Sequence, residues 1–281
     1  MDVLARSVTQ DLAKVWNQPV IVENRAGASD VIATEAVVRS APDGYTIYMA
    51  NSVTWLTNQY LRRNLPFDPV KDLTPVIGIA QSSDVLIAGN ALAASTVKDL
   101  VALARARPGV LNYGSFGIGT ATHLDAIALE SAAGIQATHV PYKGGADVIA
   151  AVLGGQVDFA FTGLNAVIPL VKQGKIKALA YGGRQRYPAL PQVPTLRESG
   201  YGVETGGWFA WFVPSATPRA IVERIATATS SVLSVPAFRD KYLIAAGMEE
   251  MNLQGAALAE RVKESQESFA SRVKGLDIKL D

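Results

Sequence analysis

Two glycine-rich turns carry the residues best suited to chemistry in this sequence. The turns are Gly117–Thr120 (GIGT) and Tyr142–Gly145 (YKGG), and each follows a strand-like run and opens onto an apolar, helix-like run. The unpaired N–H groups of a helix's first turn, together with the helix dipole, can hold a small anion without a permanent cation. The two turns therefore predict a binding site for an anionic group, built from loops and without obvious catalytic machinery.

Two serine-centred patterns raise the alternative of catalysis. Ser95-x-x-Lys98 matches the serine–lysine pattern of penicillin-recognising enzymes, but the companion S-D-N and K-T-G motifs are absent. Ser95 also stands where a helix needs an N-cap, which is the simpler interpretation. The run Tyr113–Gly117 (YGSFG) approaches the G-x-S-x-G turn but lacks its first glycine. The alternative function is therefore a serine-dependent acyl-transfer or hydrolytic enzyme that uses Ser115 with His123.

The residue inventory argues against several other kinds of site. The chain has no cysteine, which excludes disulfides, thiol catalysis and thiolate metal sites. With two histidines and no clustered carboxylates, we expect no metal ion. The GIGT turn lacks the third glycine and the acidic residue of a dinucleotide fingerprint, so we expect no cofactor. The formal net charge of +1 indicates neither nucleic acid nor an anionic membrane as a partner, and no apolar run is long enough to span a bilayer.

Helix-like and strand-like runs alternate along the 281 residues. Helices are predicted at residues 3–16, 28–40, 53–61, 95–107, 121–133, 147–153, 166–173, 218–231, 236–246 and 256–273. Strands are predicted at residues 19–23, 45–50, 76–79, 85–88, 111–114, 137–140, 157–161, 176–180 and 208–213. Strands separated by helices favour a parallel sheet and an α/β fold.

The pattern predicts two domains. Residues 100–212 are expected to form one α/β domain, and residues 1–99 together with 213–281 the other. A chain that leaves one domain, builds a second and returns forms a hinged cleft, and ligands bind at the C-terminal ends of strands in such sheets. Both glycine-rich turns and the region of Thr162 follow predicted strands.

An ordered set of segments resembles one protein family across essentially the whole chain. The segments are VENRAGAS, APDGYT, LPFDPVKDLTPV, GSFGIGTATHL, VPYKGGAD, LGGQVDFAF, GKIKALA, PTLRESGY and a tryptophan-rich run before Pro214. This set resembles the Bug/TctC family, the extracytoplasmic solute-binding proteins of tripartite tricarboxylate transporters. The resemblance implies a two-domain periplasmic-binding-protein (Venus flytrap) fold with a ligand cleft between the domains. It also implies no catalysis, and domain closure over a small carboxylate-bearing solute.

The resemblance also implies which residues contact the ligand, with backbone amides, hydroxyls and ordered waters holding its carboxylates. The implied ligand-binding positions are Asn51, Ser52, Thr54, Ser115, Gly119, Thr120, His123, Tyr142, Gly144, Gly145, Ala146, Asp147, Thr162, Gly163, Trp208 and Phe209. Asp147 is expected to cap the helix after YKGG or to bond the ligand's neutral or amino end. Trp208 and Phe209 are expected to form a wall that, with Trp55, favours one or two carboxylates on an apolar or aromatic frame.

The expected partners and location also come from the resemblance. It implies a periplasmic, monomeric protein that binds a small organic acid and the subunits of a membrane transporter, and no nucleic acid. The helix that starts at Asp2 directly follows Met1, whereas the family has a strand and a Pro-Gly-Gly turn before this helix. We therefore expect a longer natural chain that carries these elements and a signal peptide.

Overall fold

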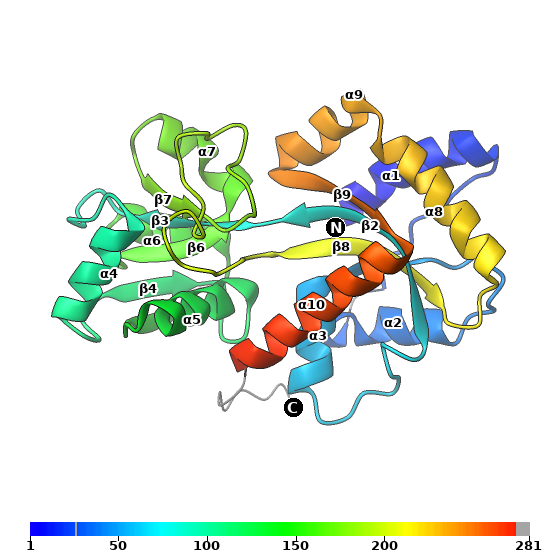
Figure 1. The fold of residues 1–281 in the computed structure, drawn as a ribbon, viewed down its shortest axis with the longest axis horizontal. Helices are drawn as coiled ribbons and strands as arrows, with labels where there is room; N and C mark the ends of the chain where they lie inside the picture. Colours follow the sequence, from blue (N-terminus) through cyan, green and yellow to red (C-terminus); the bar gives the residue numbers. More distant parts are fainter. Residues whose placement is uncertain (26, 274–281) are drawn as a thin grey trace. The chain divides into compact units, whose positions relative to one another are not determined.

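The computed structural model describes residues 1–25 and 27–273, and Figure 1 shows their course. The side chains of residues 29, 53, 54 and 272 lie outside the description. The chain divides into two compact units. Unit 1 comprises Met1–Gln81 and Gly207–Asp281, and unit 2 comprises Ser82–Gly206.

The chain passes between the units at residues 81–82 and 206–207, whereas the sequence pattern places the domain boundaries at 99–100 and 212–213. The difference at the first crossing arises because β3 (Asp84–Ala88) pairs with strands of unit 2 on both sides. At the second crossing, β8 (Gly207–Pro214) pairs with a strand of unit 1. Strand pairing, which the local pattern does not reveal, thus sets the division.

Unit 1 is built on a sheet whose described strands run in the order β1-β8-β2-β9. The other strands are β1 (Tyr48–Asn51), β2 (Leu73–Ser82) and β9 (Met248–Gln254). The helical elements are α1 (Asp2–Trp16), η1 (Ala28–Asp30), α2 (Val31–Val38), α3 (Ser52–Leu61), α8 (Arg219–Leu233), α9 (Pro236–Phe238), η2 (Arg239–Leu243), η3 (Ile244–Ala246) and α10 (Gly255–Val273).

Strand β8 organises the core of unit 1 because both of its faces are covered. Trp208 and Phe212 belong to a cluster with Trp55, whereas Phe209 and Trp211 join a second cluster with residues of α1 and α8. This separation follows the two-residue period of a strand. Burying each large apolar side chain contributes about 1.5–3 kcal/mol, so β8 anchors a large part of the unit.

Unit 2 is built on a sheet whose described strands run in the order β5-β4-β6-β3-β7. The other strands are β4 (Asn112–Ser115), β5 (Thr138–Pro141), β6 (Phe159–Gly163) and β7 (Lys177–Tyr181). The helices are α4 (Val97–Ala106), α5 (Ala121–Ala133), α6 (Gly145–Leu153) and α7 (Leu164–Lys172).

The sheet of unit 2 is mixed, so the expectation of a parallel sheet is only partly correct. Strand β4 runs parallel to β5 and β6, but β3 runs antiparallel to β6 and β7. The parallel strands are joined by helices, as a parallel connection requires. Strand β3 instead enters directly from the crossing at Ser82, without a preceding helix of unit 2.

Two local predictions are wrong, and one strand is missed. Residues 19–23 form neither helix nor strand, and Ile21 is 87% exposed, because this apolar run finds no pairing strand within the described part of the chain. Thr96, rather than Ser95, caps α4: its hydroxyl accepts a hydrogen bond from the N–H of Asp99, whose carboxylate accepts from Thr96 N–H in return. Strand β9 is missed because its sequence, MEEMNLQ, is charged and only partly buried.

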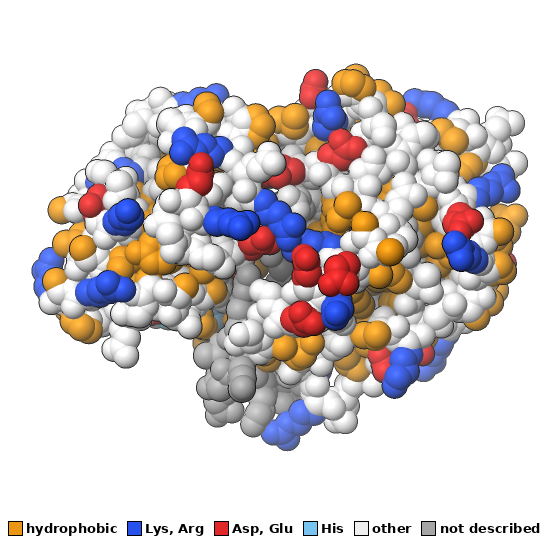
Figure 2. Space-filling view, viewed as in Figure 1, with side chains coloured by type: hydrophobic (Ala, Val, Ile, Leu, Met, Phe, Trp, Pro, Cys, Tyr) orange, Lys and Arg blue, Asp and Glu red, His pale blue; other side chains and the backbone are white. Residues whose placement is uncertain are grey.

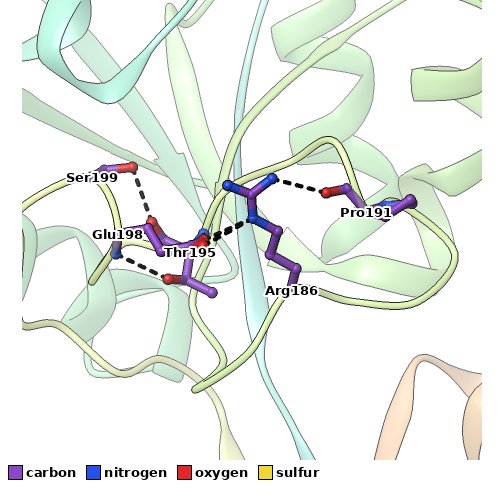
Figure 3. A network of polar contacts seen from close by, with 5 residues as sticks. All are labelled: Arg186, Pro191, Thr195, Glu198 and Ser199. Carbon is purple, nitrogen blue, oxygen red and sulfur yellow. Dashed lines mark hydrogen bonds and ion pairs between the residues drawn. The ribbon is translucent and has the colours of Figure 1, made fainter.

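The return connection after β7 is ordered by a polar network, which Figure 3 shows. Arg186 Nε lies 3.0 Å from both carboxylate oxygens of Glu198, and Arg186 Nη1 donates to the carbonyl of Pro191 at 3.1 Å. Glu198 Oε2 accepts a hydrogen bond from the N–H of Thr195 at 2.7 Å, and Thr195 Oγ1 accepts one from the N–H of Glu198 at 3.0 Å. The N–H of Thr195, followed by Arg186, holds the pKa of Glu198 below its usual range. The connection is therefore a fixed part of unit 2.

Candidate anion-binding site in unit 2

The parallel strands of unit 2 bring the predicted turns to one edge of the sheet. Ser115 and Pro141, which end β4 and β5, are direct partners in the strand register, and Gly114 pairs with Ala160 of β6. Helices α5, α6 and α7 begin shortly after these strand ends. The N-termini of the helices therefore gather at the carboxyl edge of β4, β5 and β6, as the sequence predicted for unit 2.

The turns also approach one another closely. A Cβ added to Gly145 would lie 3.3 Å from Phe116 Cζ and 3.9 Å from Thr162 Oγ1. A Cβ added to Gly117 would lie 3.9 Å from the carbonyl oxygen of Tyr142. The structure thus brings together GIGT, YKGG and the end of β6, which are far apart in the sequence.

The GIGT turn leaves the first turn of α5 without a side-chain cap. Gly117 and Gly119 have φ values of 125° and 76°, which glycine adopts without strain. Thr120 occupies the N-cap position, but its hydroxyl donates to the carbonyl of Gly117 at 2.7 Å and does not cap α5. Since the first N–H groups of a helix have no partner within it, the amides that begin at Ala121 are donors suited to an anion.

Helix α6 begins in a similar way. Gly144 is its N-cap and supplies no side chain, so the first-turn amides are again without a side-chain cap. Asp147 is the third residue of α6 and is exposed, and the expected capping hydrogen bond is not formed. The capping prediction is wrong because glycine occupies the position from which a side chain would cap the helix. Contact between Asp147 and a ligand stays a prediction.

Ser115 pairs with His139, and not with His123 as the catalytic alternative requires. The buried Ser115 Oγ lies 2.6 Å from His139 Nε2 and accepts a hydrogen bond from Gly117 N–H at 3.1 Å. His123 Nδ1 accepts from Gly119 N–H at 3.0 Å, so this nitrogen carries no proton. Burial, followed by the neighbouring His139, lowers the pKa of His123 to about 4. Ser115 and His123 therefore each stabilise the GIGT turn by accepting a hydrogen bond from one of its backbone N–H groups.

The two imidazoles form a stack in the interior of the site. Their ring centroids are 4.0 Å apart, and the ring of Tyr113 stacks on His139 at 5.0 Å. Burial also lowers the pKa of His139. Burial thus disfavours the charged form of both rings, because an imidazolium would lose hydration there.

The predicted positions in unit 1 have structural roles. Ser52 opens α3, directly after Asn51 at the end of β1, and its buried hydroxyl accepts from Trp208 N–H at 2.8 Å. Trp208 is 1% exposed, and its indole N–H donates to Ser265 Oγ at 2.9 Å. These contacts account for both side chains without a ligand, and the side chain of Thr54 lies outside the described residues.

The other expected wall residues are also parts of the unit 1 core. Trp55 meets Trp208 edge-on at 5.8 Å, and Phe209 is 8% exposed on the opposite face of β8. An aromatic wall at the ligand thus stays a prediction, and the packing within unit 1 gives it no support.

Sequence reasoning missed two contributors to the site. The ring of Phe116 lies close to Gly145, and the N–H of Phe116 donates to Thr122 Oγ1 at 3.0 Å, which fixes the start of the GIGT turn. The support that His139 gives to Ser115 was also missed. A signal for it exists, because His139 stands on the strand that leads into YKGG, next to the strand of Ser115.

The described residues offer neither a metal site nor a membrane-spanning helix. In the part of the chain that is described, no group of three or more His, Asp or Glu side chains is placed to hold a metal ion. Within the same residues, no helix is both long and apolar enough to cross a membrane.

On the face shown in Figure 2, acidic and basic side chains lie interspersed.

Comparison with known proteins identifies the family. Residues 4–275 match the family model described as the tripartite tricarboxylate transporter family receptor, TctC. The chain belongs to this family, which consists of solute-binding receptors and not of enzymes. The resemblance seen in the sequence motifs is thereby confirmed.

Individual relatives agree with the family match. The chain is 34% identical over 224 residues to the protein BugT of Bordetella pertussis, covering 79% of this chain and 69% of the relative. The solved structure of R. palustris Rpa4515 with adipate superimposes with a TM-score of 0.79 at 32% identity, covering 97% of this chain and 91% of the other. MatC (Rpa3494) from Rhodopseudomonas palustris with bound malate gives a TM-score of 0.73 at 28% identity, covering 97% and 94%. The predicted two-domain periplasmic-binding-protein fold is confirmed.

Proposed function

We propose that this protein is a periplasmic receptor that captures a small organic acid with one or two carboxylates and delivers it to a tripartite tricarboxylate-type membrane transporter. Membership of the TctC family supports the receptor role, the periplasmic location and the transporter. The adipate and malate in the related structures support a dicarboxylate as the ligand.

The observation that carries this proposal is the gathering of the α5, α6 and α7 N-termini at one edge of the unit 2 sheet. A carboxylate at this edge would accept hydrogen bonds from first-turn amides. Hydrogen bonds to a charged group each contribute about 1.5–3 kcal/mol, and each helix dipole adds about 0.3–1 kcal/mol. Micromolar affinity corresponds to about 8 kcal/mol, and such donors contribute to it after the cost of association has been offset. The proposed donors are the first-turn amides that begin at Ala121 in α5 and at Gly145 in α6, with Thr162 beside them.

A single amide can be removed to test the placement. Ala121 is the first residue of α5, where proline is tolerated, and the preceding Thr120 has φ −73° and ψ 164°, a conformation that suits a residue before proline. Ala121→Pro removes one N–H from the proposed site, whereas the control Ala121→Gly keeps it. Calorimetry with adipate, malate, citrate and benzoate first identifies a ligand that the wild-type protein binds.

The two variants are then compared with that ligand. We expect Ala121→Pro to weaken binding by about tenfold or more and Ala121→Gly to change it by less than about threefold. Equal affinity of both folded variants and the wild type would overturn the placement of the carboxylate. Turnover of an ester substrate by the wild type would overturn the receptor assignment.

A further inference from the structure

An exposed isoleucine stands in the middle of the GIGT turn. Ile118 is 67% exposed, although isoleucine is among the residues that proteins bury most often. Single exposed apolar side chains are common on protein surfaces, so its position is what matters. Among the described residues of unit 2, the other exposed large apolar side chains are Val110, which precedes β4, and Leu153, which ends α6. Of these three, Ile118 lies beside the helix N-termini that form the proposed anion site.

The backbone of the turn does not require an isoleucine at this position. The N–H of Thr120 donates to the carbonyl of Gly117 at 3.3 Å, which closes a β-turn around Ile118 and Gly119. Gly119, with φ 76°, suits the third position of a type II turn, where φ is positive. The second position, which Ile118 occupies, makes no such demand, and proline is common there. The fold therefore gains little from an isoleucine here, which points to a role outside folding.

A second apolar side chain of the same segment borders the site. A Cβ added to Gly145, the first residue of α6, would lie 3.3 Å from Cζ and 3.5 Å from Cε1 of Phe116. The edge of this ring therefore lies against the start of α6. Phe116 is only partly buried and does not belong to the large buried cluster of the unit 2 core. Phe116 and Ile118 thus place hydrocarbon next to the first-turn amides.

The hydroxyl groups of the same segment are already engaged within the protein. Those of Ser115 and Thr122 are buried and hydrogen-bonded there. Thr120 donates its hydroxyl proton to the carbonyl of Gly117 at 2.7 Å. The turn therefore offers backbone N–H groups to a carboxylate and a hydrocarbon side chain to the atoms beyond it. A ligand hydroxyl placed against Ile118 would lose hydration without gaining a partner from that side chain.

We propose that Ile118 sets the ligand class by packing against the hydrocarbon chain of the bound acid, so that the receptor prefers linear dicarboxylates with a methylene chain over hydroxy acids. This inference rests on the proposed function, since the first-turn amides of α5 must hold one carboxylate beside the turn. Adipate has the required chemistry, succinate has a shorter chain, and malate is succinate with a hydroxyl group added. Each methylene group that becomes buried against apolar atoms strengthens binding about fourfold.

Calorimetry with adipate, succinate and malate tests the contact. The proteins are the wild type, Ile118→Ala and the control Val110→Ala, which shortens another exposed apolar side chain of unit 2. We expect the wild type to bind adipate more tightly than succinate, and succinate more tightly than malate. In Ile118→Ala the affinity for adipate should fall about fivefold, and that for succinate less than about twofold, because the longer chain loses more contact. Val110→Ala should leave all three affinities unchanged.

The outcomes separate this inference from the proposed function. Equal losses for adipate and succinate in Ile118→Ala, or tightest wild-type binding of malate, would overturn the contact with the chain. Unchanged adipate affinity in Ile118→Ala, together with weakened binding in Ala121→Pro, would overturn the role of Ile118 and leave the carboxylate site in place. Adipate affinity that neither variant changes, or no binding of any of the three acids, would contradict the proposed site and this inference together.

A direct measurement follows the δ1 methyl group of Ile118 by NMR. Its signal in a ¹³C-methyl spectrum is assigned by its absence from the spectrum of Ile118→Val, which keeps an apolar side chain at this position. In the complex with adipate, we expect nuclear Overhauser contacts between this methyl group and the methylene protons of the ligand. A complex that forms without these contacts would overturn the proposal.

Discussion

Ser115 Oγ on β4 lies 2.6 Å from His139 Nε2 on the neighbouring strand β5. The register places His139 opposite Tyr113, two residues before Ser115 on the same face of β4, so the imidazole reaches the serine across the strand pair. The hydroxyl of Ser115 in turn accepts from Gly117 N–H. The pair resembles part of a catalytic arrangement in composition, but its contacts are those of a support for the GIGT turn.

This support makes Ser115 and His139 a coupled pair for ligand binding. His139→Ala leaves the buried Ser115 hydroxyl without its imidazole partner, which should loosen the GIGT turn and weaken the affinity for a bound dicarboxylate by about tenfold. Ser115→Ala should have a similar effect, and the double variant should cost little more than either single one. Calorimetry gives the three affinities, and strictly additive losses would contradict the coupling.

The neutral state of His123 predicts a loss of stability in acid. Its Nδ1 accepts a hydrogen bond from Gly119, and its pKa is lowered from 6.5 to about 4. The unfolded chain therefore binds a proton here more readily than the folded one. The contribution of His123 is present above pH 6.5 and is lost as the pH falls toward about 4. In His123→Gln, which cannot titrate, the decline in melting temperature between pH 6.5 and 4.5 should be smaller than in the wild type. An equal decline would show that other groups cause it.

The hydroxyl of Thr120 closes the GIGT turn by donating to the carbonyl of Gly117. Thr120→Ala removes this hydrogen bond at the entrance to the proposed site, and we expect it to reduce ligand affinity by about 1–1.5 kcal/mol, or roughly tenfold. Thr120→Ser keeps the hydroxyl and serves as the matched control. Unchanged affinity in a folded Thr120→Ala protein would show that the turn tolerates the loss and does not hold the ligand.

Asp147 places a negative charge in the first turn of α6, next to the proposed position of a bound anion. Because it makes no capping hydrogen bond, Asp147→Asn should leave the melting temperature nearly unchanged. Removing the like charge should strengthen the binding of a dicarboxylate about two- to fivefold at low salt, and less at high salt because ions screen an exposed charge. Weaker binding would instead show that the carboxylate contacts a donor group of the ligand.

Local sequence was sufficient to predict some parts of this fold and of the candidate site. Helix α5 has the bounds predicted from its pattern, and Gly117 and Gly119 adopt the positive φ values that a glycine-rich turn indicates. Features that depend on distant neighbours could not be predicted in this way. The direction of β3 follows from the chain crossing, and the hydrogen bond from Gly206 N–H to Asp125 joins residues that only the tertiary fold brings together.

A substitution at Trp208 can distinguish a role of this side chain in the core of unit 1 from a role in ligand binding. Trp208→Phe keeps an aromatic ring in the cluster with Trp55 but removes the indole N–H that donates to Ser265. We expect a loss of about 1–2 kcal/mol in the free energy of unfolding, from the missing hydrogen bond and the smaller buried area. Ser265→Ala removes the same hydrogen bond from the other side and is the matched control. Denaturant unfolding measures the stability of both variants, and calorimetry with the identified ligand should give affinities equal to that of the wild type. A large loss of affinity in Trp208→Phe alone, with the stability of both variants similar, would place the indole ring at the ligand and favour an acid with an apolar or aromatic frame.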